Sequence, residues 1–381
     1  MSAVSKRVLI TGGAGFIGSH LADDLLAHGY HVRVIDCLDA QVHGADAALP
    51  AYLHPEVEFV RGDVRDAGAV ARALERVDTV VHLAAAVGVG QSMYQLDHYM
   101  DVNTRGTAIL LQALLNRPVE RLVVASSMSV YGEGAYRRRG VDGGAPVLSA
   151  ARNPDRLRAG CWELSDGDGA PLDPVPTAET KPPCLASVYA LSKYDQERLG
   201  LMIGRAYGIP TLALRFFNVY GPRQSLSNPY TGVLAIFASR YLNRKPPLIF
   251  EDGLQRRDFV SVYDVARACR LAIEAPAEID GVFNIGSGRA STVREIADAI
   301  RVALGSDIDA VITGTYRVGD IRHCFADGSL AEAVLGYRPQ VPLAAGIRDY
   351  VRWLDGQAAF DQVDRAAEEL ATRGLTLHGK G

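Results

Sequence analysis

Residues 7–20 read RVLITGGAGFIGSH, and this stretch decides the fold. The apolar run at its start predicts a buried strand, and the apolar spacing after the glycines predicts a helix. Between them, Gly12, Gly15 and Gly18 allow a tight turn and a close approach of the backbone to a ligand. The first turn of such a helix points N–H groups at a diphosphate. The stretch therefore predicts a dinucleotide site, and the alternative is a turn that binds nothing.

Asp36 stands at the end of the second predicted strand, residues 31–36. A carboxylate at this point can accept hydrogen bonds from both hydroxyls of an adenosine ribose, and its charge repels a 2′-phosphate. Asp36 therefore favours NAD over NADP. The alternative is that Asp36 is only a turn residue.

Strands and helices alternate through the first half of the chain. Apolar runs with helical patterns between them predict further strands at residues 57–63, 78–86, 121–127 and 211–218. Apolar strands separated by amphipathic helices are typical of a parallel sheet that is covered on both faces. We therefore expect an α/β fold with a doubly wound parallel sheet, of the Rossmann type.

The chain divides into two parts by this pattern. Residues 1–214 are expected to form the NAD-binding Rossmann domain, with a long insertion at about 133–186. This insertion is rich in Gly, Pro, Arg and Asp and shows no clear period, so it is either a surface loop or a lid over the ligand. Residues 215–381 are expected to form mainly a smaller α/β substrate-binding part, with some segments returning to the first domain. A surface helix is predicted over residues 357–373, with one apolar side made of Phe360, Val363 and Leu370.

Composition excludes several classes of protein. With 40 basic against 44 acidic residues, the net charge of −4 does not indicate binding to nucleic acid or an anionic membrane. The five cysteines are scattered without a C-x-x-C pair, so neither a disulfide framework nor a metal site is expected. The longest apolar run, residues 79–89, is too short to span a bilayer. The first strand begins at about Arg7, which leaves no room for a signal peptide, so a cytoplasmic protein is expected.

Tyr189 and Lys193 form the pattern Y-x-x-x-K on a predicted helix. Residues four apart share one helix face, so the lysine charge is expected to lower the pKa of the phenol and let Tyr189 accept a proton near neutral pH. The alternative is a surface Tyr–Lys pair. The catalytic interpretation gains weight from the dinucleotide motif and from Ser127 at the end of a predicted strand.

Taken together, the motifs resemble those of the extended short-chain dehydrogenase/reductases, in the nucleotide-sugar epimerase/dehydratase group. The resemblance covers most of the chain and rests on TGGAGFIGSH, GDVRD (62–66), HLAA (82–85), VNTRGT (102–107), SSMSVYG (126–132), YALSK (189–193), RFFNVYGPRQ (215–224), RRDFVSVYDVA (256–266) and NIGSG (284–288). The resemblance implies a homodimer, formed through helices near residues 100–116 and 188–205.

The resemblance also implies roles for individual residues on the cofactor side. It places Phe16 and Ile17 under the NAD diphosphate, Asp63 and Val64 beside the adenine, Ala84, Ala85 and Asn103 along the cofactor, and Tyr189 with Lys193 at the nicotinamide ribose. The serine four residues before Tyr131 of the V-Y-G motif is Ser127, which the resemblance assigns to the sugar hydroxyl that is oxidised. His82 is expected to pack beside the cofactor, and Tyr131 to pack at its turn.

The resemblance implies a nucleotide-diphosphate sugar as the substrate. The residues that it assigns to this ligand are Ser129, Asn218, Arg223, Arg257 and Arg322. A nearly neutral protein needs such local cations to hold a dianion. For Arg322 the alternative is an ordinary surface arginine.

Met128 and Ser129 bear on the reaction. Dehydratases of the group carry an Asp-Glu pair at these two places, and decarboxylases tend to carry a Glu at the second. Neither Met nor Ser can act as a carboxylic acid, so dehydration and decarboxylation are disfavoured. The expected reaction is NAD-dependent epimerisation at C4: oxidation, rotation of the 4-keto sugar and reduction on its other face.

The substrate is expected to be a dTDP- or UDP-linked hexose or deoxyhexose. The end of the insertion resembles that of dTDP-L-rhamnose 4-epimerase-like proteins, although the C-P-x-C cluster that many of them carry is missing here. Two other functions stay open. A 4-ketoreductase would use the same Ser, Tyr and Lys but would consume NAD(P)H, and a non-catalytic NAD-binding regulatory protein would not turn over a sugar.

Overall fold

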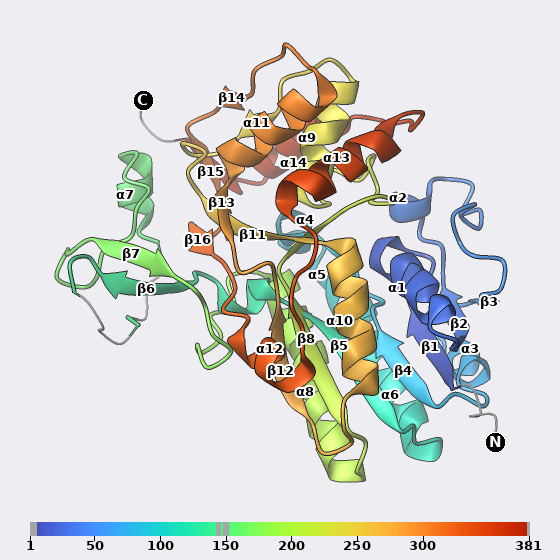
Figure 1. The fold of residues 1–381 in the computed structure, drawn as a ribbon. Coiled ribbons are helices and arrows are strands. Elements are labelled where there is room, and N and C mark those ends of the chain that lie inside the picture. The colour runs from blue at the N-terminus through green and yellow to red at the C-terminus, as the bar shows by residue number, and fades with distance from the viewer. Residues whose placement is uncertain (1–5, 142–145, 148–151, 379–381) are drawn as a thin grey trace.

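A seven-stranded parallel sheet forms the centre of the computed structural model, which describes residues 6–141, 146–147 and 152–378 (Figure 1). In spatial order its strands are β12 (Gly281–Ile285), β8 (Thr211–Phe216), β5 (Arg121–Ser127), β4 (Thr79–His82), β1 (Arg7–Thr11), β2 (His31–Asp36) and β3 (Glu58–Arg61). The order reverses between β1 and β4, as in doubly wound folds. The predicted fold class is confirmed.

Helices cover both faces of this sheet. One face carries α1 (Phe16–Ala27), α10 (Val262–Glu274) and α12 (Ser329–Leu335), and the other carries α3 (Ala67–Ala73), α6 (Gly106–Asn116) and α8 (Val188–Tyr207). The apolar residues of α1 and α10 interlock with β1 and β8, and those of α3 and α6 pack on β4 and β5. Burial on both faces explains why the strands are almost entirely apolar.

Polar residues gather where the parallel strands end. The register sets Thr11 beside His82, and Ser127 at the end of β5 beside Phe216 of β8. Ligands of open α/β sheets bind beyond the carboxyl ends of the strands, at the point where the strand order reverses. This edge is therefore where a ligand of the sheet is expected to bind.

The smaller part lies above this edge of the sheet in Figure 1. Its helices are α9 (Val233–Leu242), α11 (Val293–Leu304) and α13 (Leu343–Leu354), which share an apolar core. Its short strands pair in three groups: β11 (Arg256–Ser261) with β9 (Asn218–Tyr220), β13 (Ala290–Thr292) and β16 (His323–Cys324); β10 (Leu248–Ile249) with β14 (Val311–Ile312); and β15 (Thr315–Arg317) with β17 (Thr376–His378). Between them the chain returns to the large sheet through α10 and β12.

The insertion has more regular structure than its sequence indicated. It contains an antiparallel pair, β6 (Ala135–Arg138) and β7 (Leu172–Val175), and the short helix α7 (Pro154–Arg158). These three elements project from one side of the molecule (Figure 1). Tyr136, Leu164 and Leu172 form a small apolar core beneath the pair. The sequence showed no period here because each strand is only four residues long, and whether the insertion acts as a surface loop or a lid stays a prediction.

The tail also differs from its prediction. Helix α14 begins at Val363 and ends at Thr372, so residues 357–362 lie outside it. The Asp361 carboxylate accepts a hydrogen bond from the Val363 N–H at 3.0 Å, which favours a helix start at this point. Leu370 is buried, whereas Phe360 is 73% exposed and does not belong to an apolar helix side.

Candidate active site

The glycine turn after β1 packs tightly against the loop after β4. Gly12 has a φ of +68°, and a Cβ on it would lie 2.9 Å from the Cα of Ala84. Gly18 likewise faces the Gly12 carbonyl oxygen, which an added Cβ would approach to 2.6 Å. Gly15 directly precedes α1, and within the described part of the chain no side chain caps the N–H groups of Phe16 and Ile17 that follow. These free donors fit a diphosphate.

Asp36 is held in place at the end of β2. Its two oxygens accept hydrogen bonds from the N–H groups of Ala14 at 3.1 Å and Leu38 at 2.9 Å. His43, from the short helix α2 (Ala40–His43), brings its Nε2 to 3.8 Å from the carboxylate. Burial lowers the pKa of His43, so its ring is neutral at pH 7 and leaves the negative charge of Asp36 uncompensated. The geometry suits a ribose diol.

Arg223 lies on the dinucleotide side and not on the sugar side. Its guanidinium is 2.8 Å from the Asp23 carboxylate of α1 and sits 5.3 Å from the centre of the Tyr52 ring. The chain turns back over α1 here, because the Pro222 carbonyl bonds His20 Nε2 at 3.0 Å. The predicted role of Arg223 in binding the sugar does not fit this place. Tyr52, whose hydroxyl donates to the Ala14 carbonyl at 3.0 Å, is a neighbour of the cofactor site that sequence reasoning missed.

Asn103 links two segments at the carboxyl edge of the sheet. It lies in the π-helical turn η1 (Met100–Arg105), and its amide bonds the Ala86 N–H at 2.7 Å, the Ala86 carbonyl at 3.0 Å and the Ser192 hydroxyl at 2.8 Å. These contacts tie the loop that carries Ala84 and Ala85 to α8. The predicted cofactor contact of Asn103 is therefore replaced by a positioning role in this arrangement.

The two residues predicted beside the adenine lie just after β3. The Asp63 carboxylate accepts from the Arg65 guanidinium at 2.6 and 3.0 Å, and this hydrogen bonding lowers the pKa of Asp63. Val64 is buried next to Gly106. The pair Asp63–Arg65 fixes the loop at the outer end of the carboxyl edge.

Ser127, Tyr189 and Lys193 come together at the end of β5 and the start of α8. Burial raises the pKa of the Tyr189 phenol, and a hydrogen bond with Ser127 partly offsets the rise. Burial lowers the pKa of Lys193 to about 7, and its ammonium donates to the Gln196 side chain at 2.5 Å. The expected lowering of the phenol pKa by Lys193 is not found, because burial raises this pKa and the lysine donates to Gln196 instead.

Gln196 extends the catalytic group into the sheet, and sequence reasoning missed it. Its amide nitrogen lies 3.1 Å from His82 Nε2 and donates to the Thr107 hydroxyl at 2.9 Å, while His82 Nδ1 bonds the Thr11 hydroxyl at 2.7 Å. Burial lowers the pKa of His82 to about 3, so the ring is neutral, and its packing beside the cofactor stays a prediction. The signal was the position of Gln196 one helical turn after Lys193.

The turn η2 (Met128–Tyr131) follows β5 directly. Ser129 donates to the Ser127 hydroxyl through its N–H at 3.2 Å and its own hydroxyl at 2.9 Å. Met128 is buried against Phe217 and its neighbours, so its side chain belongs to the core. Tyr131 packs at the turn as expected, with its hydroxyl 2.6 Å from Asn284 Oδ1.

Two of the predicted substrate residues have polar groups that are available to bind a ligand. The Oδ1 of Asn218 is buried and has no hydrogen-bond partner among the described residues. Arg257 donates only to main-chain carbonyls, those of Arg256, Ile321 and Arg322, and no carboxylate pairs with it in the part of the chain that the structure describes. The uncompensated guanidinium and the free amide oxygen come from the neighbouring strands β11 and β9, and both groups fit an anionic, hydroxyl-bearing ligand.

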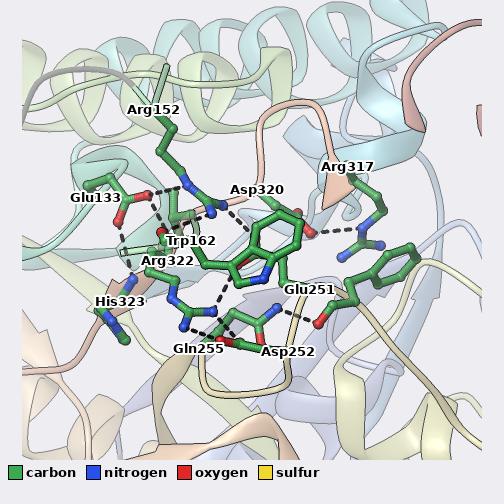
Figure 2. A network of polar contacts seen from close by, with 12 residues as sticks. Glu133, Arg152, Trp162, Glu251, Asp252, Gln255, Arg317, Asp320, Arg322 and His323 are labelled. Carbon is green, nitrogen blue, oxygen red and sulfur yellow. Dashed lines mark hydrogen bonds and ion pairs between the residues drawn. The ribbon is translucent and has the colours of Figure 1, made fainter. Parts of the chain in front are cut away.

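Arg322 is the clearest disagreement with the sequence prediction. Its side chain is 0% exposed and pairs with Glu163, Glu251 and Asp252 (Figure 2). Three carboxylates leave no free edge of the guanidinium for a phosphate. The prediction that Arg322 binds the diphosphate was wrong, and so was the surface alternative.

Arg317 is the better-placed cation of the same segment. Its guanidinium lies 4.6 Å from the centre of the Phe250 ring, and among the described residues only its Nε bonds a carboxylate, that of Asp320 at 2.9 Å. The next turn packs against the main chain just before α8, because a Cβ on Gly319 would lie 3.1 Å from the Ala186 carbonyl oxygen. The signal in the sequence was a glycine two residues after an arginine, which permits this close approach.

The family model of the NAD dependent epimerase/dehydratase family matches residues 8–154 and 164–286. The chain belongs to this family. The dTDP-L-rhamnose 4-epimerase of Burkholderia thailandensis is 37% identical over 353 residues, which cover 92% of this chain and 95% of the relative. Two solved structures of this family have the same fold. The UDP-glucose 4-epimerase of Thermus thermophilus, in complex with NAD, is 34% identical with a TM-score of 0.72, covering 92% of this chain and 100% of its own.

The second is the UDP-glucose 4-epimerase of Thermotoga maritima with UDP-glucose, 30% identical with a TM-score of 0.75, covering 92% of this chain and 99% of its own. Membership of an NAD-dependent family confirms the predicted cofactor. The free N–H groups at the start of α1, the carboxylate of Asp36 and the buried Lys193 fit NAD. None of the helices in the described ranges is both long and apolar enough to cross a membrane.

Proposed function

We propose that the protein is an NAD-dependent nucleotide-sugar 4-epimerase. The observation that carries the proposal is the group formed by Ser127, Tyr189 and Lys193 at the carboxyl edge of the sheet, with Met128 in the core and Ser129 bonded to Ser127. The group can move a proton to and from a hydroxyl. No acid stands at the two positions where dehydration needs one.

When bound, NAD+ would supply the hydride acceptor for C4. Tyr189 then takes the proton of the C4 hydroxyl, and Ser127 holds that oxygen by a hydrogen bond. Lys193 stays oriented through Gln196 and His82. After the 4-keto sugar has rotated, Tyr189 returns the proton while the hydride returns to the other face. The cycle leaves the cofactor unchanged.

The proposed substrate is a dTDP- or UDP-linked hexose or deoxyhexose. The similar proteins are a dTDP-L-rhamnose 4-epimerase and UDP-glucose 4-epimerases, and their names support this class of substrate. Arg257, Asn218 and Arg317 are proposed to bind the diphosphate and the sugar, with Ser129 near the sugar. A homodimer in the cytoplasm, with a role in deoxysugar biosynthesis, belongs to the same proposal.

One experiment tests the proposal. Purified protein is incubated, with no cofactor added, with a panel of dTDP-, UDP- and GDP-sugars, and the products are resolved by NMR. We expect a C4 epimer to form without a net change at the NADH absorbance band. A requirement for one NAD(P)H per product would show a 4-ketoreductase instead, and no conversion with any sugar would favour a regulatory NAD-binding protein. Tyr189→Phe is expected to stop conversion while bound NAD is retained.

A further inference from the structure

A network of charged side chains, most of them buried, joins the insertion to the smaller part of the molecule (Figure 2). The insertion and its stem contribute Glu133, Arg152 and Glu163, and the smaller part contributes Glu251, Asp252, Arg322 and His323. These residues enclose the segment 315–323, which begins with β15 and ends at β16. The segment also carries Arg317, the proposed diphosphate cation.

Part of this network is a permanent anchor. The Glu133 carboxylate accepts from the main-chain N–H groups of Arg322 at 2.6 Å and His323 at 3.2 Å. Arg152 pairs with Glu251 at 2.5 Å. The side chains of Glu133, Arg152 and Glu251 are nearly fully buried, so breaking these contacts would strand charges in the protein interior. The base of the insertion is therefore fixed.

Glu163 is different from the other carboxylates. One of its oxygens accepts from Arg322 Nε at 3.0 Å and Nη2 at 2.5 Å, and the other is 3.0 Å from His323 Nε2. Its side chain is 51% exposed, whereas Arg322 is 0% exposed and keeps Glu251 and Asp252 when Glu163 leaves. Glu163 can therefore separate from Arg322 at a small cost, because water solvates its carboxylate and Arg322 stays paired.

Trp162 sits next to Glu163 in the chain and contacts the same segment. The centre of its ring lies 6.3 Å from the ring of Tyr316, in an edge-to-face arrangement. Tyr316 precedes Arg317 in β15, and the Glu251 N–H donates to the Thr315 carbonyl at 2.7 Å. The insertion therefore touches the segment on both sides of Arg317.

We propose that Trp162 and Glu163 form a latch by which the insertion closes on the segment 315–323 and holds Arg317 toward the nucleotide sugar. Glu163 is a positioning residue in this proposal, because it acts through Arg322 and His323 and does not touch the ligand. The identity of the ligand rests on the proposed function. With the latch closed, the segment is fixed and binds the diphosphate; with the latch open, the segment moves and binding weakens. Proton and hydride transfer at Tyr189 do not depend on the latch.

A kinetic experiment tests the latch on the holoenzyme. In Glu163→Gln the charge that bridges Arg322 and His323 is lost, and we expect KM for the nucleotide sugar to rise about tenfold with kcat changed by less than about twofold. Glu332→Gln is the matched control, because Glu332 is also 51% exposed and pairs with an arginine, Arg338, at 2.8 Å. The control should leave both constants unchanged. A fall in kcat without a rise in KM would overturn the proposal.

A fluorescence experiment tests the latch without substrate. The chain has two tryptophans, so Trp353→Phe leaves Trp162 as the only one, and the new ring keeps the stack on Tyr350. In this background Glu163→Gln should raise the acrylamide quenching constant of Trp162 about twofold, since the indole becomes more accessible. Glu332→Gln should not. Unchanged quenching in Glu163→Gln would overturn the latch.

The two experiments separate the latch from the proposed function. If no nucleotide sugar is converted but quenching of Trp162 responds to Glu163→Gln, the latch stands and the proposed function fails. Trp162→Ala supplies a second variant that leaves every charge in place. It should raise KM in the same direction as Glu163→Gln, and an unchanged KM in both variants would overturn the proposal.

Discussion

The two arginines of the segment 315–323, Arg317 and Arg322, have different roles. Arg317 keeps its two terminal nitrogens free of carboxylates in the described part of the chain, and its guanidinium lies over the Phe250 ring. Arg322 compensates Glu251 and Asp252 inside the protein. The first arginine is therefore expected to serve binding and the second to serve stability.

Substituting each arginine by alanine should separate these effects. Arg317→Ala is expected to raise KM for the nucleotide sugar at least about tenfold with little change in thermal stability, because a charge-assisted contact with the ligand is lost. Arg322→Ala should lower the free energy of unfolding by about 3 kcal/mol, because Asp252 and Glu163 lose this partner and the buried Glu251 keeps only Arg152. Steady-state kinetics and thermal unfolding of both variants check this. A stable Arg322→Ala protein with a raised KM would contradict the assignment.

The two serines after β5 should also differ. Ser127 is proposed to bond the reacting oxygen, so Ser127→Ala is expected to lower kcat roughly a hundredfold. Ser129 bonds mainly to Ser127, and Ser129→Ala should lower kcat by less than about fivefold. Single-turnover measurements of NADH formation on both variants test the order. Equal losses would mean that the two hydroxyls share the contact.

At the residue scale, the sequence predicted the positions of those residues whose place in the fold is set by the local sequence pattern. Asp36 and the glycine turn were placed correctly because the strand–turn–helix order fixes them within one unit of structure. Arg322 was misplaced because the carboxylates that claim it lie 159, 71 and 70 residues away in the chain. Such partners leave no periodic or spacing signal near Arg322, so only the fold reveals them.

At the scale of elements, β15 depends on the end of the chain. It pairs with β17 alone among the described strands, in antiparallel register from Thr315 to Arg317. Outside that pair, the Val318 N–H donates to the Leu375 carbonyl at 2.9 Å. The C-terminal strand β17 therefore holds the strand that carries Arg317, in addition to the contacts that the insertion makes with it.

Removing residues 375–381 should expose this dependence. We expect the truncated protein to keep its NAD and its kcat, while amide hydrogen exchange at Thr315 and Arg317 becomes faster and KM rises about threefold to tenfold. Exchange in β5 serves as the internal control and should not change. Unaltered exchange in β15 would show that β17 does not support it.

Elements differed in how well the sequence predicted them. β5 was predicted with its observed bounds because its uniformly apolar run ends sharply in two serines. β6 and β7 were missed because the pairing that defines them joins residues 135–138 to 172–175, and no local signal carries such a partner. Helix α14 was predicted too long, since the Asp361 side chain starts it later than its apolar spacing indicated.

At the scale of the whole molecule, α8 bears on the oligomeric state. Leu191 and Met202 are exposed on the same side of this helix, which bears Tyr189 at its start. The proposed dimer would cover these side chains. Met202→Glu is expected to shift the protein from dimer to monomer, measured by light scattering, while Val302→Glu on α11 is a control at another exposed apolar position. A monomeric wild-type protein would contradict the proposed dimer.

Acid stability should depend on buried histidines spread over the molecule. Burial lowers the pKa of His82 to about 3 and that of His20 to about 4, both from 6.5, and it also lowers the pKa of His43 and His323. Between the lowered and the ordinary pKa the folded protein binds fewer protons than the unfolded chain, so the free energy of unfolding falls as pH falls below about 6.5.

His82→Gln tests this dependence at one site. The amide can still bond Thr11 and Thr107 but does not titrate, so the midpoint of thermal unfolding should fall less steeply between pH 6.5 and about 4 than in the wild type. His54→Gln, at an exposed position, should leave the slope unchanged. An identical slope in His82→Gln and wild type would show that His82 does not contribute.

The stem of the insertion has a consequence for how the chain can be altered. Ser127 lies before the insertion and Tyr189 after it, yet the Cys184 N–H donates to the Val130 carbonyl at 2.9 Å and closes the loop beside both. Gly132 lies against the Cys184 carbonyl, where a Cβ would approach to 2.3 Å. These main-chain contacts hold the two ends of the insertion next to each other. The length of the insertion therefore does not change the positions of Ser127 and Tyr189. The projecting part is thus a module that could be exchanged for another without moving the reacting groups.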